Sequence, residues 1–132
     1  MQVEHIAWQV PDPVALAEWY THYLGFQVVR RGQGPTLAHF LVDATGRVVI
    51  EVYHNPAASI PDYPAQSPLI LHLAFTVPDI AAARDRLLNA GATLAEDFTT
   101  TPAGDEIAML RDPWGFPLQL VKRLRPMLPV PP

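Results

Sequence analysis

The sequence repeats itself about halfway along the chain, and this repeat limits the choice of folds more than any other feature. The segment VEHIAWQVPD at residues 3–12 returns as LILHLAFTVPD at residues 69–79. His5 and His72 hold the same place in the two copies. The unit is longer than the roughly 20 to 50 residues of a solenoid repeat. We therefore expect a duplicated half-domain.

Each copy predicts the order strand, helix, strand, strand, strand. Alternating apolar residues indicate strands, and a Pro-Asp pair stops the first strand of each copy and caps the helix that follows. A glycine, Gly25 or Gly91, then ends that helix. The expected strands are Gln2–Val10, Phe26–Arg31, Thr36–Val42 and Arg47–Tyr53 in the first copy and Leu69–Val77, Glu106–Leu110 and Pro117–Lys122 in the second. The expected helices cover residues 13–24 and 80–90.

The fold that follows is one α+β domain over residues 1–132. Its two βαβββ repeats, at about residues 1–55 and 69–123, are expected to form a cupped, partly closed eight-stranded mixed sheet with helices on its outer face. Four prolines between residues 56 and 68 cannot continue a helix or a ladder, so this segment is expected to be a linker. The tail at residues 124–132 is expected to be extended.

Composition and charge restrict the partners of the chain. It has 132 residues, 49% of them hydrophobic, and a formal net charge of −4. Nine basic residues against 13 acidic ones argue against nucleic acid. Cysteine is absent, which excludes disulfides and thiolate chemistry, and no apolar run approaches the roughly 18 residues of a membrane span. We expect a cytoplasmic protein that binds neither nucleic acid nor a membrane.

Four polar residues interrupt apolar strands at positions that the repeat relates. His5 and His72 come from the first strands of the two copies, while Glu51 and Gln119 come from the last strands. Strand alternation places all four on the face away from the helices. A carboxylate without a partner is costly on such a surface. Two imidazoles, a carboxylate and an amide oxygen suit a divalent ion, namely Zn, Ni, Co, Mn or Fe, and the alternative is a pair of hydrogen-bonded structural histidines.

Two phrases, WYTHYLGFQVV at residues 19–29 and DPWGFPLQLV at residues 112–121, add a family resemblance. With the duplicated βαβββ order and the four polar positions, they make the chain similar to the vicinal-oxygen-chelate superfamily. That superfamily holds glyoxalase I, methylmalonyl-CoA epimerase, bleomycin-resistance proteins, fosfomycin-resistance enzymes and extradiol dioxygenases. The resemblance covers nearly the whole chain, from Val3 to about Arg123. It implies that one divalent metal ion is held by four ligands: His5, Glu51, His72 and Gln119.

The resemblance implies a metal-dependent glyoxalase-like lyase or isomerase. Such an enzyme chelates two adjacent oxygens of a small metabolite and abstracts a proton next to a carbonyl. The departure from the family is Gln119, where members more often have a glutamate that serves as ligand and, in glyoxalase I, as base. Since Gln119 cannot accept a proton, Glu51 is the expected catalytic base. Relatives with this layout are mostly dimers, so a homodimer is expected.

Four further residues are expected to contact the substrate: Gln9, Tyr53, Asn55 and Met109. Asn55 resembles a substrate-contacting Asn of bacterial glyoxalase I, while Gln9 stands where glutathione-using members tend to carry an arginine. Strand alternation places Tyr53 and Met109 on the same face as the four ligands, where they either line the pocket or only fill it. The alternative function is a metal-free small-molecule binding protein of the bleomycin-resistance type. A ring-cleaving dioxygenase fits less well, since it needs three open metal positions and four protein ligands leave two.

Overall fold

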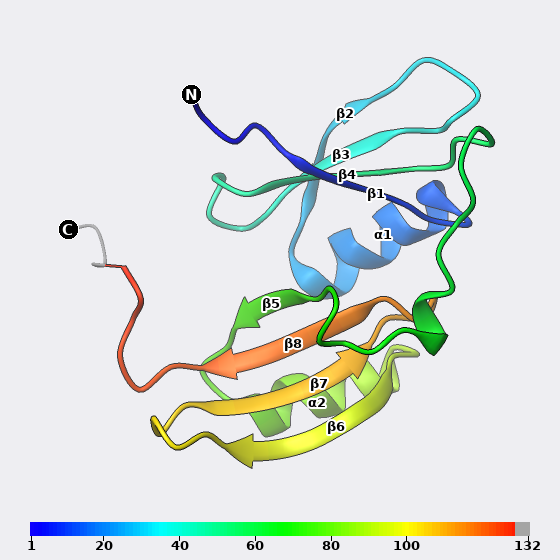
Figure 1. The fold of residues 1–132 in the computed structure, drawn as a ribbon. Helices are drawn as coiled ribbons and strands as arrows, with labels where there is room; N and C mark the ends of the chain where they lie inside the picture. Colours follow the sequence, from blue (N-terminus) through cyan, green and yellow to red (C-terminus); the bar gives the residue numbers. More distant parts are fainter. Residues whose placement is uncertain (129–132) are drawn as a thin grey trace. The chain divides into compact units, whose positions relative to one another are not determined.

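The structure, a computed structural model, describes residues 1–128 of the chain. The chain divides into two compact units, Met1–Pro61 and Asp62–Pro132. Each unit contains one α-helix and one four-stranded mixed sheet (Figure 1). The two βαβββ repeats predicted from the sequence are therefore confirmed, and their eight strands form two four-stranded sheets.

The first unit has the strand order β1-β4-β3-β2. β1 runs parallel to β4, and the other neighbouring strands are antiparallel. A bulge between Val28 and Arg30 interrupts the pairing of β2 with β3. The elements of this unit are β1 (Ile6–Gln9), α1 (Pro13–Leu24), β2 (Gln27–Arg31), β3 (His39–Val42) and β4 (Val49–Tyr53).

Helix α1 begins and ends at the residues that its sequence predicts. The Asp12 carboxylate accepts a hydrogen bond from the Ala15 N–H at 3.0 Å, and Pro13 takes the first helical position. Gly25 ends the helix with a φ of 75°, a left-handed conformation that a residue without Cβ adopts without strain. Both predicted ends of this helix are confirmed.

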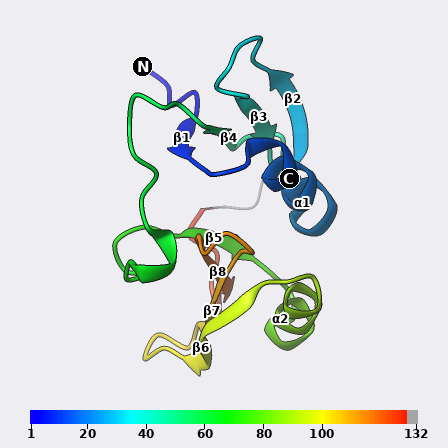
Figure 2. The same ribbon diagram turned by 90° about the vertical axis from the view of Figure 1, so that its right-hand side faces the viewer.

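The core of the first unit lies between α1 and one face of the sheet. Leu16 and Tyr20 of the helix are fully buried, as are Leu41, Ile50 and Val52 of β3 and β4. Full burial of an apolar side chain of this kind contributes about 1.5 to 3 kcal/mol. Figure 2 shows α1 on one side of its sheet. The alternate side chains of β1, β3 and β4 therefore lie on the face that the helix does not cover.

The second unit repeats this order as β5-β8-β7-β6, with β5 parallel to β8. Asp79 caps its helix by accepting from the Ala82 N–H at 2.9 Å, as Asp12 caps α1. Of the helices in residues 1–128, none is long and apolar enough to cross a bilayer. The elements are β5 (Leu73–Thr76), α2 (Ile80–Asn89), β6 (Thr93–Thr100), β7 (Glu106–Arg111) and β8 (Pro117–Lys122). Its buried core includes Ile80, Leu87, Leu110, Leu118 and Leu120.

The registers of the two sheets show the duplication residue by residue. Ala7 lies opposite Glu51 in the parallel pair of β1 and β4, and Ala74 lies opposite Gln119 in the pair of β5 and β8. In both copies the histidine stands two residues before that alanine. The two copies therefore place equivalent polar residues at equivalent positions of the ladder.

Four strands begin at least two residues later than predicted, among them β3 at His39 and β4 at Val49. β5 begins at Leu73, so the predicted strand at residues 69–77 is wrong over its first half. Residues 68–71 form a turn instead, which Pro68 favours because it has no N–H for a ladder. β1 likewise begins only at Ile6. Both histidines therefore precede their strands rather than lying within them.

The proline-rich segment between the copies contains a short ordered element. Residues Tyr63–Ala65 form a 3₁₀ helix, which Asp62 caps. The Arg111 guanidinium donates hydrogen bonds to the carbonyls of Tyr63 and Gln66, at 2.8 and 2.7 Å. These bonds attach the segment to β7.

Strand β6 and the C-terminal tail carry the weakest sequence signal in the second unit. The repeat implies a strand at this place, but no clear alternation marks Thr93–Thr100, because bulges break its register with β7 in two places.

Of the predicted tail, residues 124–128 contain no helix or strand, and residues 129–132 lie outside the described residues.

Candidate functional site

A side chain of β4 and one from the segment just before β1 form the centre of the site in the first unit. The Nε2 atom of His5 lies 3.2 Å from the Oε2 atom of Glu51. Both side chains are partly buried, with 29% and 20% of their surfaces exposed. Glu51 lies in the middle of β4, on the face opposite α1, and His5 directly precedes β1. The structure therefore brings together the two predicted ligands of the first copy.

Neighbouring groups orient the His5 ring. It packs edge-on against the ring of Phe40 in β3, with centroids 5.4 Å apart. Its Nδ1 atom is buried and has no hydrogen-bond partner within residues 1–128, while the Oε1 atom of Glu4 comes within 3.5 Å. A small approach of Glu4 would let Nδ1–H donate to this carboxylate, the arrangement that commonly orients metal-binding histidines.

The spacing of His5 Nε2 and Glu51 Oε2 suits a metal ion. Metal bonds to imidazole nitrogen and carboxylate oxygen are about 2.0 to 2.2 Å long, so two such ligands separated by 90° to 109° lie about 2.8 to 3.6 Å apart. The observed 3.2 Å falls within this range. The same distance lets the two groups form an ion pair when His5 is protonated and no metal is bound.

His72 of the second unit lies in the bend just before β5, and its side chain is exposed. Its Nδ1 atom is 2.8 Å from the carbonyl oxygen of Pro68. When Nδ1–H donates to this carbonyl, the lone pair of Nε2 is free to bind a metal. Metal-binding histidines commonly adopt this tautomer, with a backbone carbonyl as the partner of the other nitrogen.

Gln119 lines a small cavity in the second unit. The volume of the cavity is about 80 Å³, and its walls include Met109 of β7 and Glu96 of β6. These three residues lie in register on neighbouring strands. The partly buried Gln119 amide makes no hydrogen bond within the part of the chain that the structure describes. Its oxygen is therefore available to a ligand.

Two of the predicted substrate-binding residues hold a loop. Gln9 is buried; its Nε2 donates to the Ala58 carbonyl at 2.6 Å, and its Oε1 accepts from the Asn55 N–H. The Asn55 side chain in turn accepts from the Ala57 N–H at 2.9 Å. Tyr53 is partly buried at the end of β4, in register with Gln9. Gln9 and Asn55 therefore shape the loop that follows β4.

A larger hollow in the first unit lies away from these residues. It has a volume of about 710 Å³ and is walled by α1, β2 and His39. Its walls carry charges of both signs, from Glu18 and Arg31. Neither His5 nor Glu51 lines it. The polar residues that the repeat relates therefore point to the face opposite the helix, and not to this hollow.

The metal-binding potential of the described chain is divided between the units. Within residues 1–128, no group of three or more His, Cys, Asp or Glu side chains is arranged to hold an ion. The first unit supplies a pair of ligand atoms at a metal-like spacing. The second unit supplies an oriented imidazole at His72 and an unpartnered amide at Gln119. Their donor types, imidazole nitrogen and carboxylate or amide oxygen, fit a divalent first-row metal ion in chemistry.

Sequence reasoning did not identify Glu96. Its segment lacks the alternation that marks most strands, because of the bulges in β6. The repeat does mark the position of Glu96. The sequence separation between His5 and His72 is the same as that between Val29 of β2 and Glu96, so the two residues are equivalent in the two copies. Both Val29 and Glu96 stand at a break in the register of their strand.

Comparison with protein families adds the observation that decides the assignment. The sequence model of the family described as "Glyoxalase/Bleomycin resistance protein/Dioxygenase superfamily" matches residues 2–120. The chain belongs to this superfamily. None of the curated proteins compared with it matches at a significant level.

Solved structures share the fold of this superfamily member. SMU.1112c is 28% identical, with 92% of this chain and 98% of that chain covered and a TM-score of 0.72. A glyoxalase family protein from Enterococcus faecalis is 24% identical, with 92% and 97% covered and a TM-score of 0.72. Glyoxalase I from Zea mays is 20% identical, with 90% of this chain but 43% of that chain covered, also at a TM-score of 0.72. The last two likenesses show the fold alone.

Members of the glyoxalase superfamily often bind a divalent metal, usually bind small-molecule substrates and often form dimers. In this member, the sequence repeat relates His5 to His72 and Glu51 to Gln119.

Proposed function

We propose that this superfamily member is a metal-dependent glyoxalase-like lyase or isomerase that acts on a small oxygenated metabolite. One divalent ion (Zn, Ni, Co, Mn or Fe) is held by four ligands: His5, Glu51, His72 and Gln119. The observation that carries the proposal is the 3.2 Å between His5 Nε2 and Glu51 Oε2, at positions of the ladder that the second copy repeats. Two of the four ligands come from each unit. The two units that share an ion can belong to one chain or to two copies of the chain, and both arrangements give one ion per chain.

The donor set supports this assignment. Imidazole and oxygen ligands suit divalent first-row metals, and the chain offers no thiolate that would select a softer ion. When bound, the ion supplies a Lewis acid to two adjacent oxygens of the substrate. Phe40 packs edge-on against His5 and restricts the orientation of its ring.

Glu51 is the residue proposed to accept the proton. Its Oε2 atom faces His5, whereas its Oε1 atom makes no hydrogen bond to the described residues. A carboxylate oxygen without a partner can take a proton from a carbon next to a carbonyl. The Gln119 amide is not basic, so its proposed role is limited to binding and orientation.

Hydrogen exchange at the substrate carbon tests this function. The chain, loaded with Ni²⁺ or Zn²⁺, is incubated in D₂O with hydroxyacetone or glycolaldehyde, and loss of the C–H signal next to the carbonyl is followed by proton NMR. We expect exchange that depends on the metal and that falls about 100-fold or more in Glu51→Gln, the usual contribution of a general base. Glu18→Gln, an exposed carboxylate of α1, should exchange as wild type. Exchange that survives Glu51→Gln unchanged would contradict the assigned base.

The alternative is a metal-free protein that sequesters a small aromatic molecule. It is favoured by the absence, within residues 1–128, of a gathered group of three acidic or histidine ligands. Elemental analysis of protein purified without chelator separates the two functions. A chain that takes up no metal after incubation with Ni, Co, Zn or Mn would support the binding protein.

The proposed assembly is a homodimer. β2 and β6 are edge strands of their sheets, and nearly all of their residues are exposed. Exposed edges of this kind are commonly covered by another strand or another copy. Light scattering should give about twice the 14.6 kDa of one chain, and a monomer mass at all concentrations would refute the dimer. One domain over residues 1–132 and a cytoplasmic location stay predictions.

A further inference from the structure

The cavity beside Gln119 contains a carboxylate that the proposed reaction does not use. Glu96, Met109 and Gln119 lie in register across β6, β7 and β8, and all three line this cavity. A volume of about 80 Å³ corresponds to two or three water molecules of about 30 Å³ each. The cavity therefore has room for one small chemical group of a ligand.

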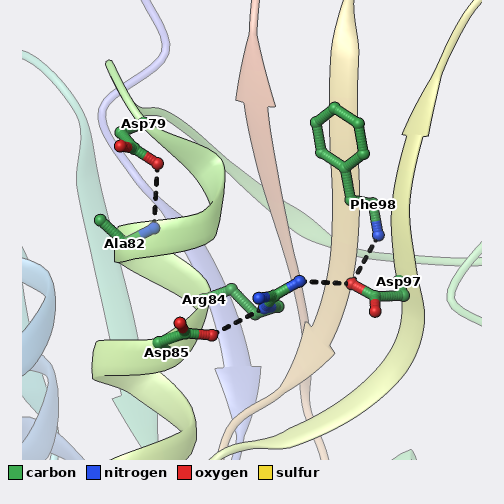
Figure 3. Close-up of polar contacts among 6 residues, drawn as sticks. All are labelled: Asp79, Ala82, Arg84, Asp85, Asp97 and Phe98. Atoms are coloured by element: carbon green, nitrogen blue, oxygen red, sulfur yellow. Dashed lines mark hydrogen bonds and ion pairs between the residues drawn. The ribbon is translucent and has the colours of Figure 1, made fainter.

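Asp97, the neighbour of Glu96 in β6, forms an ion pair with the helix. Arg84 of α2 donates to the Asp97 carboxylate at 2.9 Å and to Asp85 at 2.9 Å (Figure 3). The same Asp97 carboxylate accepts the Phe98 N–H at 2.7 Å. Asp97 borders the cavity, but its charge is already paired with Arg84. Glu96 lines the same cavity and is exposed, and bulges interrupt the pairing of β6 with β7 on both sides of it.

Glu96 itself lacks a charged partner. Within residues 1–128 it makes no hydrogen bond or ion pair, and no basic side chain lines the cavity. A ligand that covers this carboxylate removes water from it, which costs free energy unless the ligand supplies a positive charge or hydrogen-bond donors. An anionic group would be repelled. The cavity therefore favours cations over neutral or anionic groups.

We propose that Glu96 selects ligands that carry an ammonium group a few bonds away from the oxygens bound near Gln119. The place of those oxygens rests on the proposed function, whereas the charge preference follows from the cavity alone. Neighbouring strands lie about 4.8 Å apart, so the Cα atoms of Glu96 and Gln119 are about 10 Å apart. Both residues line the cavity, so a ligand that occupies it can meet both side chains. A spacer of about two to four atoms then connects the two ends of the ligand.

Two probes of the same shape test the charge preference. Ethanolamine carries an ammonium group where propan-1-ol carries a methyl group. Their binding to the full chain is followed by the NMR shift of the ¹³C-labelled methyl group of Met109, which lies between Glu96 and Gln119 in register. We expect ethanolamine to bind about fivefold more tightly, as one partly solvated ion pair allows. In Glu96→Gln the two probes should bind equally.

Glu106→Gln is the matched control. Glu106 belongs to β7 and pairs with Lys122 at 3.3 Å, and it does not line the cavity, so its loss should leave the preference unchanged. The titrations are repeated after chelator treatment, so that coordination of the amine by a metal cannot produce the preference. Equal binding of both probes by wild type, no Met109 shift with either, or a preference that survives Glu96→Gln would each overturn the inference.

Metal uptake, measured on the same samples, separates this inference from the proposed function. A chain that takes up metal but shows no preference for ethanolamine refutes the role of Glu96 alone. A chain that prefers ethanolamine through Glu96 but takes up no metal supports the role of Glu96 and refutes the metal-dependent function.

Discussion

His5 Nε2 and Glu51 Oε2 lie 3.2 Å apart on the face of the first sheet that α1 does not cover. Core packing does not require this pair, because the helix-facing side of the sheet is built from apolar residues such as Ile50 and Val52. Removing an imidazole and a carboxylate from water costs free energy that apolar side chains would not. A ligand-binding role therefore explains the pair better than a stabilising one.

Gln119→Glu tests whether residue 119 reaches the ion. At about 4 Å and an effective dielectric near 20, attraction between two unit charges is on the order of 4 kcal/mol. Most of it should be offset, because in the proposed centre the amide oxygen already coordinates and the new carboxylate would repel Glu51. We expect a net gain of about 1 to 2 kcal/mol, or roughly five- to thirtyfold tighter metal binding, measured by calorimetry. Equal or weaker affinity would mean that residue 119 is not a ligand.

The two helix caps should contribute equally to stability, because the repeat makes them equivalent. Asp12 accepts from the Ala15 N–H and Asp79 from the Ala82 N–H, at 3.0 and 2.9 Å. Asp12→Ala and Asp79→Ala should each lower the free energy of unfolding by about 0.5 to 2 kcal/mol, measured by urea denaturation. Asp12→Asn, which keeps a capping oxygen, should change it little. An alanine variant as stable as wild type would show that its cap is dispensable.

Arg111, a partly buried residue of β7, should be costly to remove. Its guanidinium donates to three carbonyls, those of Tyr63, Gly115 and Gln66, at 2.8, 3.0 and 2.7 Å. Arg111→Met leaves these carbonyls without their donor and should lower the free energy of unfolding by about 2 to 3 kcal/mol. Arg111→Lys keeps the positive charge but loses the forked guanidinium. Its free energy of unfolding should therefore lie between those of wild type and Arg111→Met. If the Met variant unfolds at the same urea concentration as wild type, this role is wrong.

Asp97 should make stability depend on pH in acid. The Phe98 backbone N–H and then Arg84 hold the pKa of Asp97 below its ordinary value of 3.8. A carboxylate with a lowered pKa contributes stability that is present above the unfolded pKa and is lost as the pH falls through the folded pKa. Asp97→Asn should therefore be less stable than wild type at neutral pH, and the difference should vanish well below pH 3.8.

Urea unfolding midpoints at several pH values provide the measurement for Asp97. Glu18→Gln serves as the control, since Glu18 makes no ion pair or hydrogen bond to the described residues. The difference in unfolding midpoint between Glu18→Gln and wild type should not change with pH in the way expected for Asp97→Asn. A difference between Asp97→Asn and wild type that stays constant from neutral to strongly acid pH would contradict the linkage.

The sequence predicted the fold through its repeat, and the reason is physical. The same Pro-Asp pair after each first strand supplies a helix cap, and the repeat relates Glu51 to Gln119 in the sheet register. The strand prediction failed where the alternation of apolar and polar side chains did not determine the backbone conformation. Residues 68–71 are apolar enough for a strand but form a turn after Pro68.

The candidate site was only partly predictable for a related reason. Alternation placed His5 and Glu51 on one face, and the structure brings their atoms together. Gln9 had the same parity, but its amide binds the backbone of the loop after β4, a contact that no periodicity encodes. Glu96 was missed because the bulges of β6 hide its alternation.

The number and identity of metal sites per chain test the proposed metal centre most directly. Chelator-treated protein is titrated with Ni²⁺ by isothermal calorimetry, with far-UV circular dichroism to confirm folding. We predict about one site per chain, and affinity lower by on the order of 100-fold or more in His5→Ala and in His72→Ala, since loss of even an outer partner costs up to that much. His54→Ala, an exposed histidine outside the site, should bind as wild type. A wild-type chain that binds no Ni²⁺, or a folded His5→Ala variant that binds it as tightly as wild type, would contradict the proposed centre.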